Sequence, residues 1–328
     1  MNRKLHIDLD DVRLAVVRDG PAVDETDKPL VLFLHGFPEL AHSWRHQIAA
    51  LAAAGYPVMA PDQRGYGDSD KPAGVDDYAM SRLVGDVTGL LDHAGVEKAV
   101  VVGHDWGALV LWALPFYAPE RLLGCAGLNV PLMPVFDRDP IPVFRRTFGD
   151  DMYIVRFQEE GAAEPLLERD VDATFRFFMR RPSAERDEPQ PGAGAAASLD
   201  LLGQLEKGSD HWGGEPLLDD AERAIYVRAF ERGGFTAPLH WYRNMSANQR
   251  DLMRFTDEDG KLPFVNLPAL QIMTELDRAC PPQLADGMET RIGPLEYHLL
   301  QQCGHWTQQE QPEAVNRLLL DWLGRHFA

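Results

Sequence analysis

The chain has 328 residues, of which 45% are hydrophobic and 25% charged, so it is long and apolar enough to bury a substantial core. Acidic residues number 51 and basic residues 32, which gives a formal net charge of −19. A surface of this sign repels phosphate backbones and anionic lipid. The composition therefore argues against a disordered chain, a nucleic-acid partner and a membrane partner.

The cysteines and the apolar runs indicate the compartment. Cys125, Cys280 and Cys303 are odd in number and show no C-x-x-C spacing, so neither a disulfide framework nor a zinc site is expected. Residues 1–18 carry three aspartates in place of the apolar stretch of a signal peptide. No apolar run reaches the length of about 18 residues that a membrane span requires. We predict a cytoplasmic protein and leave open whether it forms a homodimer.

Short apolar runs that end at turn residues alternate with longer helical patterns, which is typical of a parallel βα sheet. Strands are expected at residues 30–34, 56–60, 99–102, 124–130, 269–274 and 297–301. Helices are expected at residues 44–54, 80–94, 108–117, 173–180, 219–232 and 312–326. A Pro/Gly/Ala-rich loop is expected at residues 181–198.

The strand patterns are interrupted after residue 131, where aromatic residues, arginine and proline become frequent. They return near residue 265. We therefore predict an α/β core, residues 1–131 and 265–328, built on a mostly parallel, doubly wound sheet. A helical cap domain, residues 132–264, is predicted to be inserted into this core.

A sharp turn is predicted at residues 103–107, where the string G-H-D-W-G joins a strand to a helix. An elbow of this kind needs small residues on both flanks of the nucleophile, because larger side chains clash there. Asp105 occupies the nucleophile position, and the helix N-terminus behind it favours a carboxylate. A carboxylate attacks an sp3 carbon and leaves an alkyl ester, which suits an epoxide or an alkyl halide. The alternative is that Asp105 only caps the helix.

A second string, H-G-F-P-E at residues 35–39, follows the first strongly apolar strand. The backbone N–H groups of Phe37 and Trp106 are expected to meet over the Asp105 carbonyl and to hold the charge that develops there when water attacks the ester. His35 and Pro38 are assigned to the same oxyanion and substrate-binding wall. A simple turn would account for the first two residues of this string but not for all five.

These strings resemble the epoxide hydrolases of the α/β-hydrolase fold. The resemblance covers nearly the full chain and rests on H-S-W-R-H-Q at residues 42–47, D-Q-R-G-Y-G at 62–67 with Ser69, G-H-D-W-G at 103–107 and C-G-H-W at 303–306. The D-Q-R-G-Y-G string occurs in several hydrolase subfamilies and is interpreted as structural. The family presents its nucleophile, acid and histidine in that order along the chain.

The resemblance implies the two partners of Asp105. His305 lies between the last expected strand and the last expected helix, where it would deprotonate the water that attacks the ester. Asp277, in the string T-E-L-D, matches the family's acid and would orient His305. Glu275 is a competitor two residues earlier, because an extended segment places both carboxylates on one face. This string differs from the commoner acid loops of the family.

Two tyrosines separate epoxides from halides, because the epoxide oxygen becomes an alkoxide that needs a neutral proton donor. The strings around Tyr153 (Y-I-V-R-F-Q-E) and Tyr242 (L-H-W-Y-R-N) resemble the family's two tyrosine segments. The alternative for each is a packed aromatic residue whose hydroxyl is satisfied elsewhere.

The sequence thus predicts an epoxide hydrolase that forms a covalent hydroxyalkyl ester on Asp105. Its partners are a small epoxide and water, and neither a metal nor an organic cofactor is implied. One rival is a haloalkane or haloacid dehalogenase of the same fold. Another is a non-catalytic receptor that binds a small ligand.

Overall fold

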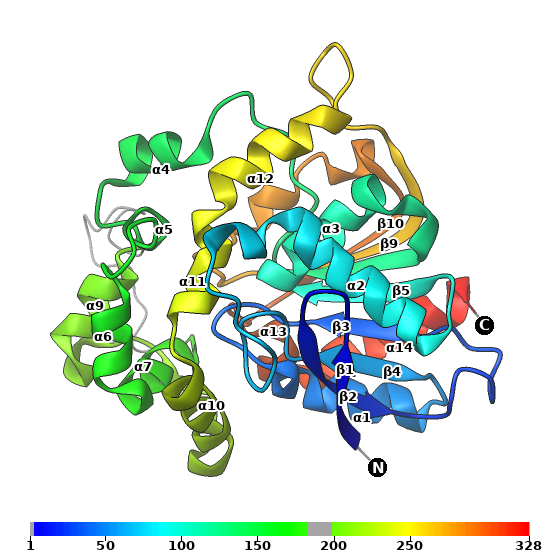
Figure 1. Ribbon diagram of the computed structural model, residues 1–328, viewed down its shortest axis with the longest axis horizontal. Coiled ribbons are helices and arrows are strands. Elements are labelled where there is room, and N and C mark those ends of the chain that lie inside the picture. The colour runs from blue at the N-terminus through cyan, green and yellow to red at the C-terminus, as the bar shows by residue number, and fades with distance from the viewer. Residues whose placement is uncertain (1–2, 183–198, 328) are drawn as a thin grey trace.

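The computed structural model describes residues 3–182 and 199–327. Most of the predicted loop at 181–198 lies outside the described residues. A single large sheet forms the centre of the molecule (Figure 1). In order across the sheet, its strands are β1 (Arg3–Asp8), β2 (Arg13–Asp19), β4 (Val58–Pro61), β3 (Val31–Leu34), β5 (Ala99–His104), β6 (Leu122–Leu128), β9 (Val265–Thr274) and β10 (Ile292–Leu300). All neighbours from β4 to β10 are parallel, whereas β1 and β2 are antiparallel additions.

Helices cover both faces of this sheet, because its strands alternate their apolar side chains between the two faces. In β3, Leu32 and Leu34 pack into a cluster shared with α2 (Met80–Ala94) and α3 (Trp106–Tyr117). Its other residues, Val31 and Phe33, pack into a second cluster shared with α1 (Arg45–Ala53) and α14 (Pro312–His326). The mostly parallel α/β sheet predicted from the sequence is therefore confirmed.

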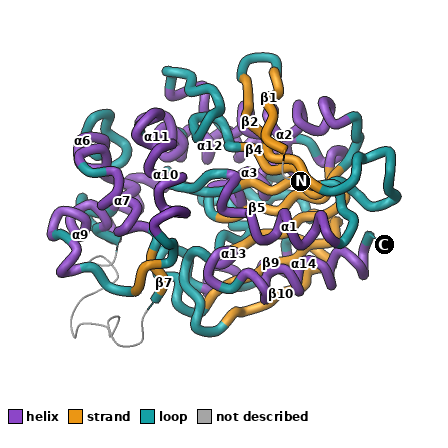
Figure 2. The backbone as a smooth tube through the Cα atoms, turned by 90° about the horizontal axis from the view of Figure 1, so that it is seen from below, coloured by secondary structure: helices purple, strands orange, loops and turns teal. Residues whose placement is uncertain are grey.

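Residues 132–264, here called the helical segment, supply a separate group of helices. They are α4 (Pro140–Phe148), α5 (Tyr153–Arg156), α6 (Glu164–Arg169), α7 (Val171–Phe178), α9 (Leu201–Lys207), α10 (Asp220–Gly233), α11 (Thr236–Arg243) and α12 (Met245–Leu252). A separate two-stranded sheet pairs β7 (Arg180–Arg181) antiparallel with β8 (Glu215–Pro216). Both ribbon views show α6, α7, α9 and α10 gathered at one side of the sheet (Figures 1 and 2).

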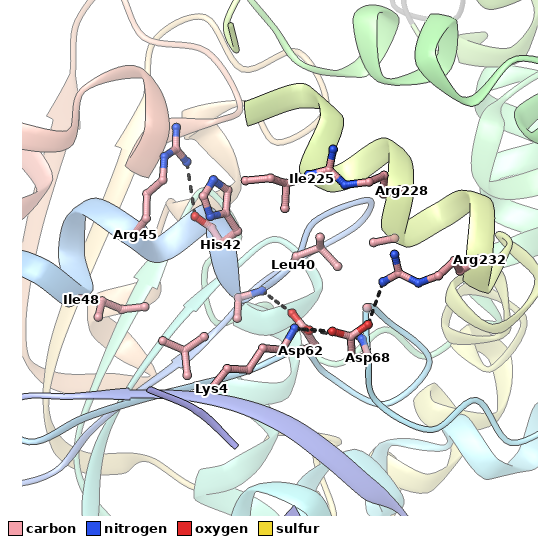
Figure 3. Close-up of a pocket in the computed structure, with 14 residues that line it drawn as sticks. Lys4, Leu40, His42, Arg45, Ile48, Asp62, Asp68, Ile225, Arg228 and Arg232 are labelled. Atoms are coloured by element: carbon pink, nitrogen blue, oxygen red, sulfur yellow. Dashed lines mark hydrogen bonds and ion pairs between the residues drawn. The ribbon is translucent and has the colours of Figure 1, made fainter. Parts of the chain in front are cut away.

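A cavity of about 270 Å³ lies where α10 meets the core (Figure 3). Ion pairs cross this junction. Asp68 forms one with Arg232 of α10 at 2.8 Å and another with Lys4 of β1 at 2.7 Å. Lys4 also pairs with Asp62 at 3.1 Å. Because these pairs are partly exposed, we assign them a role in positioning α10 rather than a large contribution to stability.

Several helices and strands begin at other residues than the sequence predicted. The β1–β2 hairpin was not predicted, and β4 begins two residues later than expected, at Val58. The helix expected from residue 44 begins as a 3-10 turn, Ala41–Trp44, and continues as α1. The helix after the elbow begins at Trp106 rather than at residue 108. Within the described residues, no helix is long and apolar enough to pass through a bilayer.

The D-Q-R-G-Y-G string has a structural role, as interpreted. The buried guanidinium of Arg64 donates to both carboxylate oxygens of Asp86, at 2.9 and 2.6 Å, and to Asp11 at 2.7 Å. Burial raises the pKa of Asp86 because it disfavours the charged carboxylate. The hydrogen bonds and charge of Arg64 oppose this rise. Removing one partner of a buried pair leaves the other charge uncompensated.

We expect Arg64→Leu to lower the free energy of unfolding by about 3–5 kcal/mol, the usual cost of an unpaired buried charge. Arg82→Leu is the matched control, since Arg82 reaches the same Asp11 at 3.1 Å but is exposed, and it should cost less than about 1 kcal/mol. Urea denaturation of both variants measures the difference. Equal losses in the two variants would contradict this account of Arg64.

Candidate active site

The predicted reactive residues lie at the carboxyl ends of parallel strands. Phe37 follows β3, Asp105 follows β5, Asp277 follows β9 and His305 follows β10. In a parallel sheet these ends open on one edge, so residues distant in sequence meet there. Each strand provides a rigid support directly behind its reactive residue.

The elbow at Asp105 is strained, as its sequence predicts. Asp105 has φ 51° and ψ −119°, a conformation that side-chain-bearing residues seldom adopt. A Cβ on Gly103 would lie 2.4 Å from the carbonyl oxygen of Gly107, and one on Gly107 would lie 2.1 Å from the carbonyl oxygen of Leu34. The two glycines are therefore required for the close approach of strand and helix, and the strain presents the carboxylate of Asp105 above the sheet edge.

The two carboxylate oxygens of Asp105 have different surroundings. Oδ1 accepts the backbone N–H of Phe37 at 2.7 Å, and the backbone N–H of Trp106 also hydrogen-bonds the carboxylate. Oδ2 lies 3.8 Å from Nε2 of His305. Burial raises the pKa of Asp105, and His305, His104 and the two amides oppose that rise. The side chains of Asp105 and His305 keep 16% and 20% of their surface exposed, so both remain in contact with solvent.

His305 and Asp277 form a close pair. Nδ1 of His305 lies 2.8 Å from Oδ2 of Asp277, whose other oxygen accepts the amides of Ala279 and Cys280 at 2.9 Å each. Burial would raise the pKa of Asp277, but the charge and hydrogen bond of His305 outweigh it and lower the pKa to about 2. Burial would lower the pKa of His305, yet Asp277 and then Asp105 raise it to about 9.

Of the two acids in the T-E-L-D string, only Asp277 contacts His305 in this structure. Glu275 is exposed, and its carboxylate accepts the backbone N–H of Gln302 at 3.0 Å. A further residue, Asn129, donates to Asp277 at 2.7 Å from the end of β6. Asn129 has φ 64° and was not predicted, although a polar residue directly after a buried strand was a usable signal.

Both predicted tyrosines lie near Asp105. Tyr242 of α11 packs edge-on against Trp106 and Phe37, with ring centroids 4.9 and 5.3 Å apart, and Tyr153 of α5 lies 6.0 Å from Tyr242. Burial and the charge of Asp105 both raise the pKa of each tyrosine well above its ordinary value. Both hydroxyls therefore remain protonated and able to donate at neutral pH.

The remaining two predicted residues are placed differently. His35 is fully buried, with 0% of its surface exposed; its Nε2 accepts the N–H of Gln63 at 3.0 Å and its ring packs edge-on against Tyr66. The assignment of His35 to the substrate wall is therefore corrected, because a side chain with no accessible surface cannot contact a substrate. Pro38 is buried next to Phe37, and its role stays a prediction.

A buried pair behind the site escaped sequence reasoning, although both members lie in the motif strings. Nδ1 of His104 lies 2.7 Å from Glu39, and its Nε2 donates to the backbone carbonyl of His305 at 2.8 Å. Gln308 also donates to Glu39 at 2.8 Å. Burial would raise the pKa of Glu39, but His104 lowers it to about 2. This network holds the backbone carbonyl of His305 in place and so limits where the His305 side chain can lie.

Comparison with known proteins identifies the family of this chain. Residues 29–312 match the model of the alpha/beta hydrolase fold family. Epoxide hydrolase A of Mycobacterium tuberculosis is 40% identical over 97% of this chain and 96% of its own length. The chain belongs to the epoxide hydrolases of the α/β-hydrolase fold. The resemblance drawn from the motif strings is thereby confirmed.

Comparison with two further epoxide hydrolases shows how much of the chain is similar to each. Bifunctional epoxide hydrolase 2 of Sus scrofa is 36% identical over 90% of this chain but only 51% of its own length, so the chain spans about half of that relative. The crystal structure of epoxide hydrolase A from Mycobacterium thermoresistibile has a TM-score of 0.86 at 36% identity and covers 100% of this chain and 99% of its own. Similarity to the mycobacterial epoxide hydrolases thus extends over the core and the helical segment together.

The charge of Asp105 has a measurable effect on His305. Asp105→Asn is expected to lower the pKa of His305 below its value of about 9, because one of the negative charges that raise it is removed. Glu275→Gln is the control and should leave the pKa unchanged, since Glu275 does not contact the imidazole. Titration of the ring by NMR measures both variants. An unchanged value in Asp105→Asn would contradict the geometry.

Proposed function

We propose that the chain hydrolyses epoxides to vicinal diols in two steps, with Asp105 as the nucleophile. The observation that carries this proposal is the difference between the two Asp105 oxygens: the Phe37 amide bonds Oδ1, whereas Oδ2 lies 3.8 Å from Nε2 of His305. Oδ2 attacks an epoxide carbon while Tyr153 and Tyr242 donate hydrogen bonds to the epoxide oxygen. The epoxide C–O bond breaks, its oxygen takes a proton from a tyrosine hydroxyl that solvent then reprotonates, and Oδ1 becomes the carbonyl oxygen of the hydroxyalkyl ester.

The second step is hydrolysis of that ester. Once Asp105 is esterified its negative charge is lost, so the pKa of His305 falls and the neutral imidazole is able to accept a proton. A water between Nε2 and the ester carbon loses its proton to His305 and attacks the carbonyl. The amides of Phe37 and Trp106, which already hydrogen-bond the Asp105 carboxylate, stabilise the oxyanion. The diol leaves with the proton that the imidazolium returns, Asp105 is regenerated, and Asp277 stabilises the imidazolium while it is present.

The two tyrosines distinguish this function from dehalogenation. We expect Tyr153→Phe and Tyr242→Phe each to lower kcat for an epoxide by about 10- to 100-fold, the value of a hydrogen bond to a developing charge of about 1.5–3 kcal/mol. The double variant should lose more than either. Phe157→Leu serves as the packing control, since Phe157 contacts both tyrosine rings but has no hydroxyl.

Turnover of styrene oxide, followed by mass spectrometry of the product, is the direct test of the function. Formation of a diol supports epoxide hydrolysis. Halide release from a haloalkane, with full activity in the double Tyr→Phe variant, would favour the dehalogenase. Recovery of both compounds unchanged after prolonged incubation would favour the receptor.

The proposal also covers the roles of the two parts of the chain, its compartment and its oligomeric state. Residues 132–264 act as the cap that supplies Tyr153 and Tyr242, and residues 1–131 and 265–328 supply the triad. The cytoplasm is the proposed compartment, supported by three cysteines that are all free. Homodimer formation stays a prediction.

A further inference from the structure

One side chain beside the triad has no role in the proposed reaction. Cys280 lies in the loop after β9, three residues beyond Asp277, and its backbone N–H donates to that carboxylate. Besides burial, the negative charges of Asp277 and Asp105 raise the pKa of its thiol. The thiol group in turn contributes to the raised pKa of Tyr153. Burial and these charges raise the pKa of the thiol well above its ordinary value, so it does not compete with Asp105 as a nucleophile.

The thiol completes a set of metal-binding atoms. One ligand atom each of Asp277, Cys280 and His305 lies within 4.8 Å of the other two, and Nδ1 of His305 lies only 2.8 Å from Asp277. Zinc ligands lie about 2.0–2.3 Å from the metal, so neighbouring ligand atoms in a tetrahedral site are about 3.2–3.7 Å apart. Side-chain movements of about an ångström therefore close the cluster around a cation. We propose that Asp277, Cys280 and His305 form an inhibitory site for a thiophilic divalent cation such as Zn²⁺ or Cd²⁺.

The chemistry of the three ligands selects the cation. A thiolate, an imidazole and one carboxylate suit Zn²⁺ and Cd²⁺, whereas Mg²⁺ and Ca²⁺ prefer sites built from oxygen alone. Three protein ligands leave a fourth position for water. The cation at this site is an inhibitor and not a cofactor, because the proposed reaction needs both ring nitrogens of His305.

Binding is balanced in protons and charge. As the metal–sulfur bond forms, the Cys280 proton passes to solvent, and the Nδ1 proton of the His305 imidazolium passes to solvent when that nitrogen binds the metal. The neutral ring keeps its proton on Nε2. The cluster is formally neutral before binding, as imidazolium and carboxylate, and neutral afterwards, as dication, carboxylate and thiolate. The electrostatic surroundings of Asp105 therefore change little.

This balance predicts which step stops. Asp105 can still open an epoxide, because its charge and its amide contacts are unchanged. The Nε2 of His305 now carries a proton and has no free lone pair, so it cannot accept a proton from water. The hydroxyalkyl ester should therefore form once and persist. This kinetic part of the inference rests on the two-step function proposed above, whereas metal binding itself does not.

Binding is tested without substrate. The full chain is titrated with Cd²⁺ and followed by the ultraviolet charge-transfer band of a cadmium thiolate. One equivalent is expected to bind in the native chain and in Cys303→Ala, the control for the other cysteine near the triad. Cys280→Ala, with Cys280→Val as a second variant, should bind more than about 100-fold more weakly, since loss of even an outer contact of a metal site costs about 10–100-fold. Equal binding in the Cys280 variants, or no thiolate band, would overturn the site.

The kinetic consequence is tested with styrene oxide and saturating Zn²⁺. We expect one epoxide to be consumed per chain, an intact mass raised by that of the substrate, and no further diol. Cys280→Ala should continue to turn over, and Mg²⁺ should have no effect on either protein. Inhibition of equal size in Cys280→Ala, or a block of the first alkylation, would refute the inference. Absence of diol from the metal-free native chain would instead count against the proposed function, while the Cd²⁺ titration would still decide the site.

Discussion

Replacing Asp105 with asparagine is expected to lower kcat/KM for an epoxide by about 10⁴–10⁶-fold, the loss seen when one member of a nucleophilic triad is removed. The amide is a far weaker nucleophile than the carboxylate, so no ester forms. Asparagine is chosen because it tolerates the φ of 51° at this position better than most residues do. The fold should therefore survive the change.

Steady-state assays and intact mass spectrometry check this result together. A folded Asp105→Asn protein should show neither diol formation nor a rise in mass with epoxide. Gln302, which also has a positive φ of 52° but lies outside the triad, provides the control: Gln302→Asn should retain activity. Substantial activity in a verified sample of Asp105→Asn would show that another group attacks the epoxide.

Replacing His305 with glutamine should separate the two steps. Because Asp105 needs no base to attack the epoxide, the first step continues and the ester accumulates. Turnover should fall by about 10²–10⁴-fold, the usual contribution of a general base. The expected observation is a stoichiometric burst of epoxide consumption, with one adduct on the peptide that contains Asp105.

A matched variant tests whether the position of His305 matters as well as its identity. His104 donates to the His305 carbonyl and pairs with Glu39, so Glu39→Gln should disturb the same step more mildly. In that variant the ester should be detectable but short-lived. A His305→Gln protein that forms no ester at all would mean that the imidazole is also needed for epoxide opening.

The meeting of the candidate site residues at one sheet edge was predictable because these residues lie in short strings with local physical causes. The G-H-D-W-G string fixes the elbow: two glycines allow strand and helix to approach, and Asp105 is the only acid between them. The order of nucleophile, acid and histidine then located Asp277 and His305 at two later strand ends. Family and fold were confirmed by the relatives and by the mostly parallel sheet.

The parts that escaped prediction depend on contacts between distant segments. The β1–β2 hairpin is stabilised by pairing with β4 across the sheet, as in Val16 opposite Pro61. The burial of Glu39 with His104 joins residues 65 positions apart. The orientation of His35 likewise depends on Gln63 from another loop, whose N–H donates to its ring. The motif alone does not show this contact, so it suggested that His35 faces the substrate.

In the proposed mechanism, the oxygen that the substrate gains in the first turnover comes from Asp105. Single-turnover hydrolysis of styrene oxide in ¹⁸O-water, with the enzyme in excess, tests it most directly. We expect a first-turnover diol that is mostly unlabelled, with the label found in the Asp105 carboxylate. A labelled diol and an unlabelled Asp105 would mean that water attacks the epoxide directly, and the assignment of Asp105 as nucleophile would be wrong.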